Sequence, residues 1–175
     1  MKTVTINLYQ FSELSDEAKE NAIKELYDIN VNSDWWYGVY EDAAQVNLKI
    51  KGFDIDRGSY VKAEFMQSAY DTANLITLNH GESCETYKTA LTFIQDWNNL
   101  VSKYSDGVKT DVVTEDNEYD FDNEADDLEN DFLQSISEDY RIILRNEYDC
   151  LTSEKSIIET IEGNDYYFTE NGQLK

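Results

Sequence analysis

The chain has 175 residues, of which 41% are hydrophobic and 13% aromatic, which is enough apolar material for a folded domain and argues against global disorder. Its 37 acidic residues outnumber 14 basic ones, so the net charge is −23. A field of this sign repels DNA, RNA and anionic membranes and attracts basic surfaces. We therefore expect a basic protein partner and no direct binding to nucleic acid or membrane.

The cysteines and the hydropathy of the chain narrow the class of protein further. The two cysteines, Cys84 and Cys150, form no CxxC pair, so neither a disulfide framework nor a cysteine zinc site is indicated. The start, MKTVTINLYQF, lacks the apolar core of a signal peptide. No run approaches the roughly 18 apolar residues of a membrane span. These features favour a cytosolic protein.

The first third of the chain predicts one strand and two helices. Residues 2–10 alternate polar and apolar side chains, as a half-buried strand does. Ser15 followed by two acids predicts an N-cap and a helix over 15–29. Ser33 is the expected N-cap of a second helix, SDWWYGVYEDAAQVN.

The middle of the chain predicts a hairpin and two more helices. In LKIKGFDIDRGSYVKAEF, residues 48–65, two alternating runs flank Arg57-Gly58, and Gly52 indicates a bulge or bend. Helices are expected over 67–80 and 84–104, with Gly81 as a C-cap between them.

The last third predicts an extended piece over 108–114 and then a long helix over 120–149. Ser153 is expected to cap a short helix that ends at Glu162. The ending NDYYFTENGQLK predicts a final strand before an Asn-Gly turn.

This order of elements predicts an α+β fold, in which a small antiparallel sheet of about four strands is covered by several helices, including the long acidic helix near 120–149. We expect a single domain over 1–175. Its parts would be a sheet-and-helix core (1–107), the acidic segment with the long helix (108–149), and a closing helix and strand (150–175).

The acids concentrate in one window. Residues 110–140 contain 13 acids and no Lys, Arg or His, which is more than half of the net charge. At 100° per residue, one apolar stripe forms within about 80°: Phe121, Ala125, Leu128, Phe132 and Ile136. Asp122, Asp126 and Glu129 flank the stripe on one side; Asp120, Glu124, Asp127 and Asp131 flank it on the other.

Carboxylates on one flank step by about 5–6 Å, and a helix with side chains is about 10–12 Å across. Because the major groove of B-DNA is about 12 Å wide, such rows could occupy a phosphate-binding cleft. The alternative is a solvated helix face. A third possibility is a calcium loop, because Asp120, Asp122, Glu124 and Asp126 alternate; however, Ala125 and Asp131 replace the glycine and the glutamate of an EF-hand.

Other candidate chemistry is less specific. His80 and Cys84 have the spacing of a possible nucleophile pair, but Gly81 interrupts it and no oxyanion motif accompanies it. The acids around Arg57 could form a site with Glu64 or a local ion pair. The aromatic block at 35–40 is either core or a partner-contact patch.

For the candidate site we therefore expect no catalytic residue, no metal ligand and no cofactor. Its residues are the acids of 115–131 and two aromatic anchors: Glu115, Asp116, Glu118, Asp120, Asp122, Glu124, Asp126, Asp127, Glu129, Asp131, Trp35 and Tyr37.

Five segments carry a family resemblance: FSELSDEAKENAIKELYDINV, WWYGVYEDA, KGFDIDRGSY, CETYKTA and NDYYFTENGQL. The chain resembles a family of small phage and prophage proteins of mostly unknown function, some of them labelled as the antitoxin of a toxin–antitoxin stability system. The resemblance covers most of the chain outside the acidic section around 110–131. It implies a phage context and action in the cytoplasm of a bacterial host, and it assigns no catalytic residue.

Three functional hypotheses follow. The first is a non-enzymatic phage protein that inhibits a host defence nuclease or CRISPR effector by nucleic-acid mimicry at a basic cleft. The second is an antitoxin-like protein that masks a basic partner. The third is a metal-dependent enzyme whose acids converge from separate segments.

Overall fold

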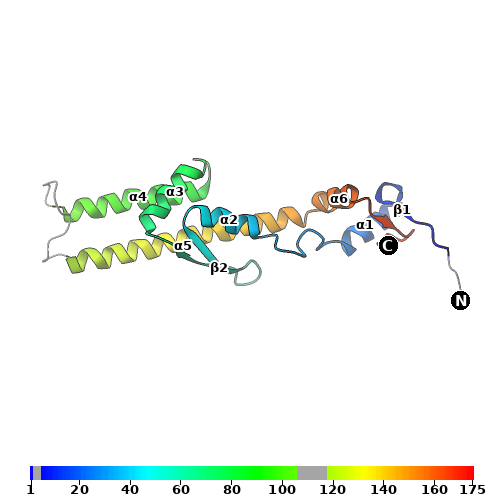
Figure 1. The fold of residues 1–175 in the computed structure, drawn as a ribbon, viewed down its shortest axis with the longest axis horizontal. Helices are drawn as coiled ribbons and strands as arrows, with labels where there is room; N and C mark the ends of the chain where they lie inside the picture. The colour runs from blue at the N-terminus through cyan, green and yellow to red at the C-terminus, as the bar shows by residue number, and fades with distance from the viewer. Residues whose placement is uncertain (2–4, 106–117) are drawn as a thin grey trace. The chain divides into compact units, whose positions relative to one another are not determined.

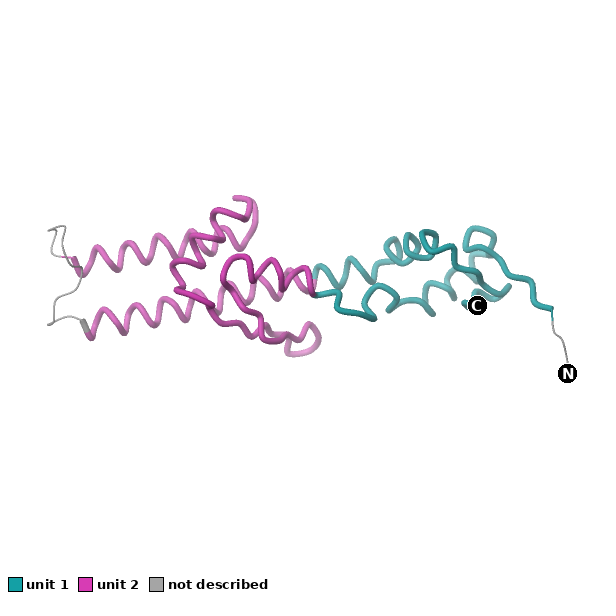
Figure 2. The backbone as a smooth tube through the Cα atoms, viewed as in Figure 1, with its two compact units in different colours: residues 1–36, 146–175 teal, residues 37–145 magenta. Residues whose placement is uncertain are grey.

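A computed structural model describes residues 1, 5–105 and 118–175. The chain forms two compact units (Figure 2). Unit 1 comprises residues 1–36 and 146–175, and unit 2 comprises residues 37–145. The fold class is α+β, as the sequence predicts, with six α-helices and four short strands in the described ranges (Figure 1).

Unit 1 joins the two ends of the chain. Its elements are β1 (Tyr9–Gln10), the 3₁₀ helix η1 (Phe11–Glu13), α1 (Asp16–Glu25), α6 (Glu154–Gly163) and β4 (Tyr167–Phe168). Strands β1 and β4 pair antiparallel, with Tyr9 opposite Phe168. The Ser15 hydroxyl accepts a hydrogen bond from the Ala18 amide, and Ser153 accepts one from the Ser156 amide, so both predicted N-caps are confirmed.

The core of unit 1 is a small apolar cluster between the helices and the strand pair. Its buried members are Phe11, Leu14, Ala18, Ala22, Ile157, Ile161 and Phe168. The predicted Asn-Gly turn packs directly against the backbone of α1 beside this cluster. Gly172 has a φ of +83°, and a Cβ there would overlap the Ala18 carbonyl. Only glycine fits that position.

Unit 2 contains the hairpin and most of the helices. Its elements are α2 (Tyr37–Gln45), β2 (Leu48–Asp54), β3 (Tyr60–Phe65), α3 (Ala69–Asn79) and α4 (Glu85–Tyr104). Helix α5 (Glu118–Leu151) runs through unit 2, and its last residues belong to unit 1. Leu48 pairs with Phe65 and Asp54 with Tyr60, and the register shifts between Ile50 and Gly52, which confirms the predicted hairpin and bulge.

An aromatic cluster fills the space between α4 and α5 in unit 2: Phe65, Phe93, Trp97, Phe121 and Phe132. Phe93 and Phe132 stack with ring centroids 4.4 Å apart, and Phe65 stacks on Phe132 at 5.6 Å. Trp97 meets Phe121 edge-on at 6.4 Å. These rings connect the hairpin, α4 and the acidic half of α5 into one core.

Polar contacts fix α5 at three further points in unit 2. The buried Tyr140 hydroxyl donates to the Asp42 carboxylate of α2 at 2.8 Å. The Thr89 hydroxyl of α4 donates to Asp139 at 2.7 Å. Arg145 donates to the Ile55 carbonyl, beyond β2, at 2.7 Å. The position of α5 is thus set by α2, α4 and the hairpin together.

The predicted sheet, one predicted strand and one predicted helix differ from the structure. The sheet of about four strands is not confirmed, because the strands of the described residues form two separate antiparallel pairs. Of the strand expected over 2–10, only Tyr9–Gln10 is a strand; residues 5–8 are not, and residues 2–4 lie outside the described part. The helix expected over 15–29 ends at Glu25, and turns follow.

Both wrong cap predictions have a local cause. Ser33 does not cap α2, which begins at Tyr37, because the Trp35 amide donates to the Ser33 carbonyl in a turn and the Trp35 ring packs on Tyr148 at 5.5 Å. Helix α3 ends with His80 in an extended conformation, so no left-handed residue is needed at Gly81. The extended piece expected over 108–114 lies outside the described residues.

Replacing Phe132 with alanine should lower the free energy of unfolding by about 3–5 kcal/mol, because the ring is 3% exposed and stacks on two others. Urea denaturation followed by far-ultraviolet circular dichroism measures this change. Tyr119→Ala is the control, since that ring is on the same helix and 80% exposed, and it should change stability by less than about 0.5 kcal/mol. Equal effects of the two substitutions would show that the aromatic cluster does not hold α5.

Candidate acidic interaction surface

The predicted apolar stripe of α5 is confirmed as its buried face. Ala125, Phe132 and Ile136 are buried, and Phe121 and Leu128 are half-buried. The carboxylates therefore occupy the flanks and the outer face of a packed helix. Among the candidate acids, Glu115 and Asp116 lie outside the described residues, and Glu118 is the first residue of α5.

Five aspartates of α5 form what we call the acidic surface: Asp120, Asp122, Asp126, Asp127 and Asp131. All five are exposed, and none has an ion-pair partner within the described ranges. Two pairs among them, Asp122 with Asp126 and Asp127 with Asp131, are one helical turn apart, which brings like charges together. The surface is thus strongly negative and is not neutralised by its own unit.

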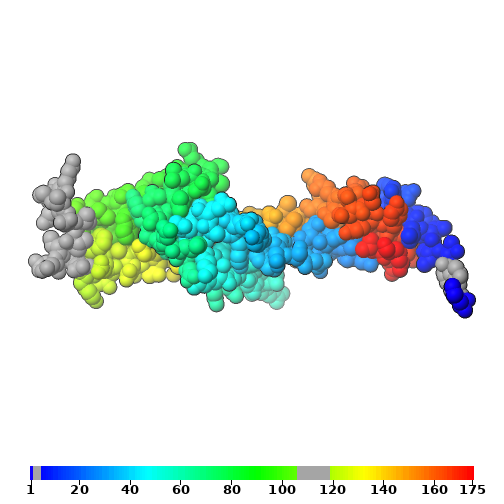
Figure 3. Space-filling view, viewed as in Figure 1, coloured from blue at the N-terminus to red at the C-terminus, as the bar shows by residue number. Residues whose placement is uncertain are grey.

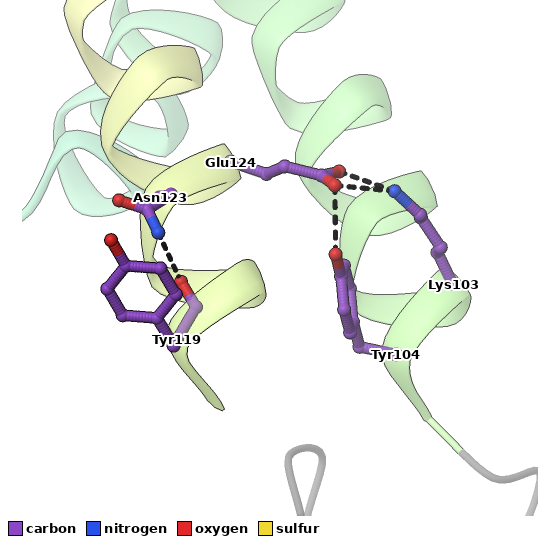
Figure 4. Close-up of polar contacts among 5 residues, drawn as sticks. All are labelled: Lys103, Tyr104, Tyr119, Asn123 and Glu124. Carbon is purple, nitrogen blue, oxygen red and sulfur yellow. Dashed lines mark hydrogen bonds and ion pairs between the residues drawn. The ribbon is translucent and has the colours of Figure 1, made fainter. Parts of the chain in front are cut away.

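Glu124 differs from these aspartates because it is already occupied (Figure 4). Its carboxylate accepts from the Lys103 ammonium at 2.6 and 2.7 Å and from the Tyr104 hydroxyl at 2.8 Å. The hydrogen bond from Lys103 lowers the pKa of Glu124, and the hydrogen bond from Tyr104 lowers it further. Glu124 therefore ties the end of α4 to the start of α5, and its charge is already paired with Lys103.

Glu129 is the least solvated candidate acid. It is half-buried, and burial raises the pKa of its carboxyl group, with the neighbouring charge of Asp126 adding to the effect. Its charged form is thus held in a partly apolar setting, which costs stability.

The two predicted flanks lie in different surroundings. Glu124, Asp127 and Asp131 line a depression beside α4, whereas Asp122, Asp126 and Glu129 lie on the other side of the apolar stripe. In the space-filling view, α4 and the first half of α5 lie side by side (Figure 3). Glu124, Asp127 and Asp131 therefore form one side of this depression, and residues of α4 form the other side.

The two predicted aromatic anchors also differ. Trp35 is half-buried and packs edge-on against Trp36 at 5.8 Å and Tyr148 at 5.5 Å, all in unit 1. Tyr37 is 60% exposed at the start of α2. The structure thus gives Trp35 a packing role and leaves the ring of Tyr37 accessible.

Tyr119 is an exposed aromatic residue that the sequence interpretation missed. Its ring is 80% exposed beside Asp120, and its carbonyl accepts from the Asn123 amide at 2.6 Å (Figure 4). At 100° per residue it lies about 160° from Phe121, opposite the packed stripe. The same helical projection that identified the flanks contained this signal.

The calcium-loop alternative does not fit the backbone. Asp120, Asp122, Glu124 and Asp126 lie on an α-helix, where alternate residues point in different directions, so they cannot converge as loop ligands do. Within residues 5–105 and 118–175, no group of three or more His, Cys, Asp or Glu side chains is arranged to hold a metal ion.

The other candidate pairs have different partners. His80 Nδ1 lies 2.8 Å from the Thr86 hydroxyl, and His80 Nε2 lies 3.7 Å from the Asp42 carboxylate, while Cys84 is exposed. Glu64 pairs with Lys49 and Lys51 and not with Arg57, and these two lysines lower its pKa. Local contacts thus account for Glu64 and for His80 Nδ1, whereas the buried His80 Nε2 has no hydrogen-bond partner among the described residues.

Comparisons of the chain with protein-family models, with curated proteins and with solved structures gave no match. No described helix combines the length and the apolar character that a membrane span requires.

Replacing Glu129 with glutamine should raise the urea midpoint of unfolding at about pH 7 and leave it unchanged at about pH 3. Because burial raises the pKa of Glu129 in the folded chain, its ionisation costs folding free energy above that pKa, and the cost disappears as the pH falls through it. Glu41→Gln, on the exposed face of α2, removes the same charge as a control. The assignment fails if both variants give the same difference at both pH values.

Proposed function

We propose that the chain is a non-enzymatic binding protein whose acidic surface docks on a basic, nucleic-acid-binding cleft of a partner protein. The observation that carries the proposal is the set of five exposed aspartates on one packed helix, without ion-pair partners in the described part of the chain. Like charges one turn apart cost about 0.2–0.5 kcal/mol per pair on an isolated helix. A fold that keeps such pairs together places negative charge where a cationic surface can meet it.

The spacing of the carboxylates supports mimicry of nucleic acid. Along one flank the side chains recur at about 5–6 Å, and the flanks lie across a helix about 10–12 Å wide. These dimensions are close to those of the phosphate rows that border a B-DNA groove of about 12 Å. A cleft that binds phosphates with Arg and Lys side chains would therefore find its negative partners at similar positions.

The resemblance to small phage proteins suggests the class of partner. In the cytoplasm of a bacterial host, the basic clefts that a phage protein gains most by blocking are those of a defence nuclease or a CRISPR effector. Exposed Tyr119 and Tyr37 are rings of the kind that dominate contact energies at protein interfaces. Tyr119 adjoins the acidic surface directly, so it is the anchor that we assign to this function.

The experiment is inhibition of DNA cleavage by a panel of purified bacterial defence nucleases and CRISPR effectors. We expect the wild-type chain to inhibit at least one of them in competition with its nucleic acid. Changing Asp120, Asp122, Asp126, Asp127 and Asp131 to asparagine should weaken that inhibition by about tenfold or more, because charge pairs at an interface contribute strongly to affinity. Raising the salt concentration should weaken the wild type more than the variant.

A second variant with the same net charge separates local from global effects. It neutralises five exposed acids away from α5: Glu25, Asp28, Glu41, Glu162 and Glu170. This control should inhibit as the wild type does. Equal loss of inhibition in both variants would reduce the effect to net charge, and absence of inhibition across the panel would overturn the proposal.

A further inference from the structure

A continuous groove runs along unit 2 between α4 and α5. Two adjoining depressions, of about 360 and 410 Å³, form it and share Asp96, Leu128 and Asp131. The remaining lining residues come from the same two helices and include Lys88, Lys103 and Asp127. Because the aromatic cluster stands between the helices, they are held apart, and the groove follows the edge of that cluster.

The charges of the groove are unbalanced. Its two bases are already paired, Lys88 with Glu85 at 2.6 Å and Lys103 with Glu124 at 2.6 Å. Asp96, Asp127 and Asp131 are exposed and have no ion-pair partner among the described residues. Three carboxylates from two helices therefore face one groove without a compensating cation.

The floor of the groove is apolar. Leu128 is half-buried and shared by both depressions, and it is bordered by the edges of Phe93, Phe132 and Leu100, each at most 8% exposed. A solvated acidic face has no need of such a floor. An apolar strip bordered by carboxylates instead complements a ligand that carries apolar and cationic groups side by side.

We propose that this groove binds a basic amphipathic helix of the partner protein, with its Arg or Lys side chains on Asp96, Asp127 and Asp131 and an apolar side chain over Leu128. The inference rests on the proposed function and names the part of the partner that enters. A helix that lays its apolar face into a groove is a common mode of recognition. Arginine and lysine on such a helix meet carboxylates in charge-assisted hydrogen bonds.

The arrangement excludes two other occupants. A metal ion needs several ligands around one point, and no group of three or more candidate ligands within the described ranges is so arranged. A nucleic acid would bring phosphates against three unpaired carboxylates. An extended ligand that carries several cationic groups therefore matches the three carboxylates of the groove.

The test uses two synthetic peptides with equal numbers of lysines. One alternates leucine and lysine at helical spacing, and the other replaces every leucine with serine. Binding to the intact chain is measured by calorimetry, and the site is mapped by amide chemical shifts. We expect the leucine–lysine peptide to bind about tenfold or more tightly than the serine–lysine peptide. The shifts should centre on α4 and α5 around Leu128.

Two charge-matched triple variants locate the site. The groove variant carries D96N, D127N and D131N. The second, which we call the flank variant, carries D120N, D122N and D126N, three positions from both flanks that do not line the groove. The groove variant should weaken binding of the leucine–lysine peptide by about tenfold, and the flank variant by less than about threefold. Circular dichroism checks that both variants keep the helical content of the wild type.

Three outcomes would each contradict the proposal that the groove binds a basic amphipathic helix. They are equal affinity of the two peptides, equal weakening by the two variants, and no binding of either peptide. The same variants in the cleavage assay separate this inference from the proposed function. If only the flank variant loses nuclease inhibition, the groove does not bind the partner, but the proposed function stands. If the leucine–lysine peptide binds in the groove but the chain inhibits no nuclease, the groove is a binding site and the proposed function is wrong.

Discussion

The structure of unit 2 depends on the stacking of Phe93 on Phe132, because this contact holds a helix that its own charges oppose. The first turns of α5 carry acids on both flanks, and repulsion between them works against a helix at this place. An isolated segment of this composition would not be helical by propensity alone. Burial of the stripe around Phe132 supplies the missing stability, and the hairpin contributes Phe65 to the same stack.

The same packing decides which carboxylates reach solvent. Once the stripe faces the aromatic cluster, the flanking acids cannot turn inward, and only Glu129 and Glu124 differ from the rest. Glu124 is drawn to Lys103 and Tyr104, which closes the open end of the two-helix arrangement. A core contact thus produces a charged surface with a fixed position, which a disordered acidic tract would not provide.

Most of the correct predictions from the sequence came from local patterns, chiefly the spacing of apolar residues along helices and strands. The stripe of α5, the hairpin with its bulge at Gly52, and the caps at Ser15 and Ser153 are local patterns, and each is confirmed. Contacts between distant segments were not predictable in this way. The pairing of β1 with β4 joins the two ends of the chain, and no local pattern indicates which strand is the partner. The Ser33 cap was wrong because Trp35 packs on Tyr148, a residue far away in the sequence.

The candidate site shows the same division. The helical projection identified the exposed acids and contained the position of Tyr119, but it could not show that Lys103 occupies Glu124. Nor could it show that Asp96 of α4 faces Asp131 across a groove, because that requires the spacing between two helices. Composition and period therefore predict a charged face, whereas only the tertiary structure divides it into a solvated flank and a groove wall.

This division assigns different physical roles to the two parts of the surface. Charges in water act over a Debye length of about 8–10 Å, so in the proposed complex the outer aspartates would attract a basic partner toward α5, and added salt would weaken this attraction. Lasting contact requires that water be displaced from apolar area. The half-buried Leu128 offers such area in the α4–α5 groove, which Asp96, Asp127 and Asp131 also line. Under the proposed function, the exposed aspartates would thus speed the encounter with a basic surface, and the groove would select a partner that brings an apolar side chain between its cations.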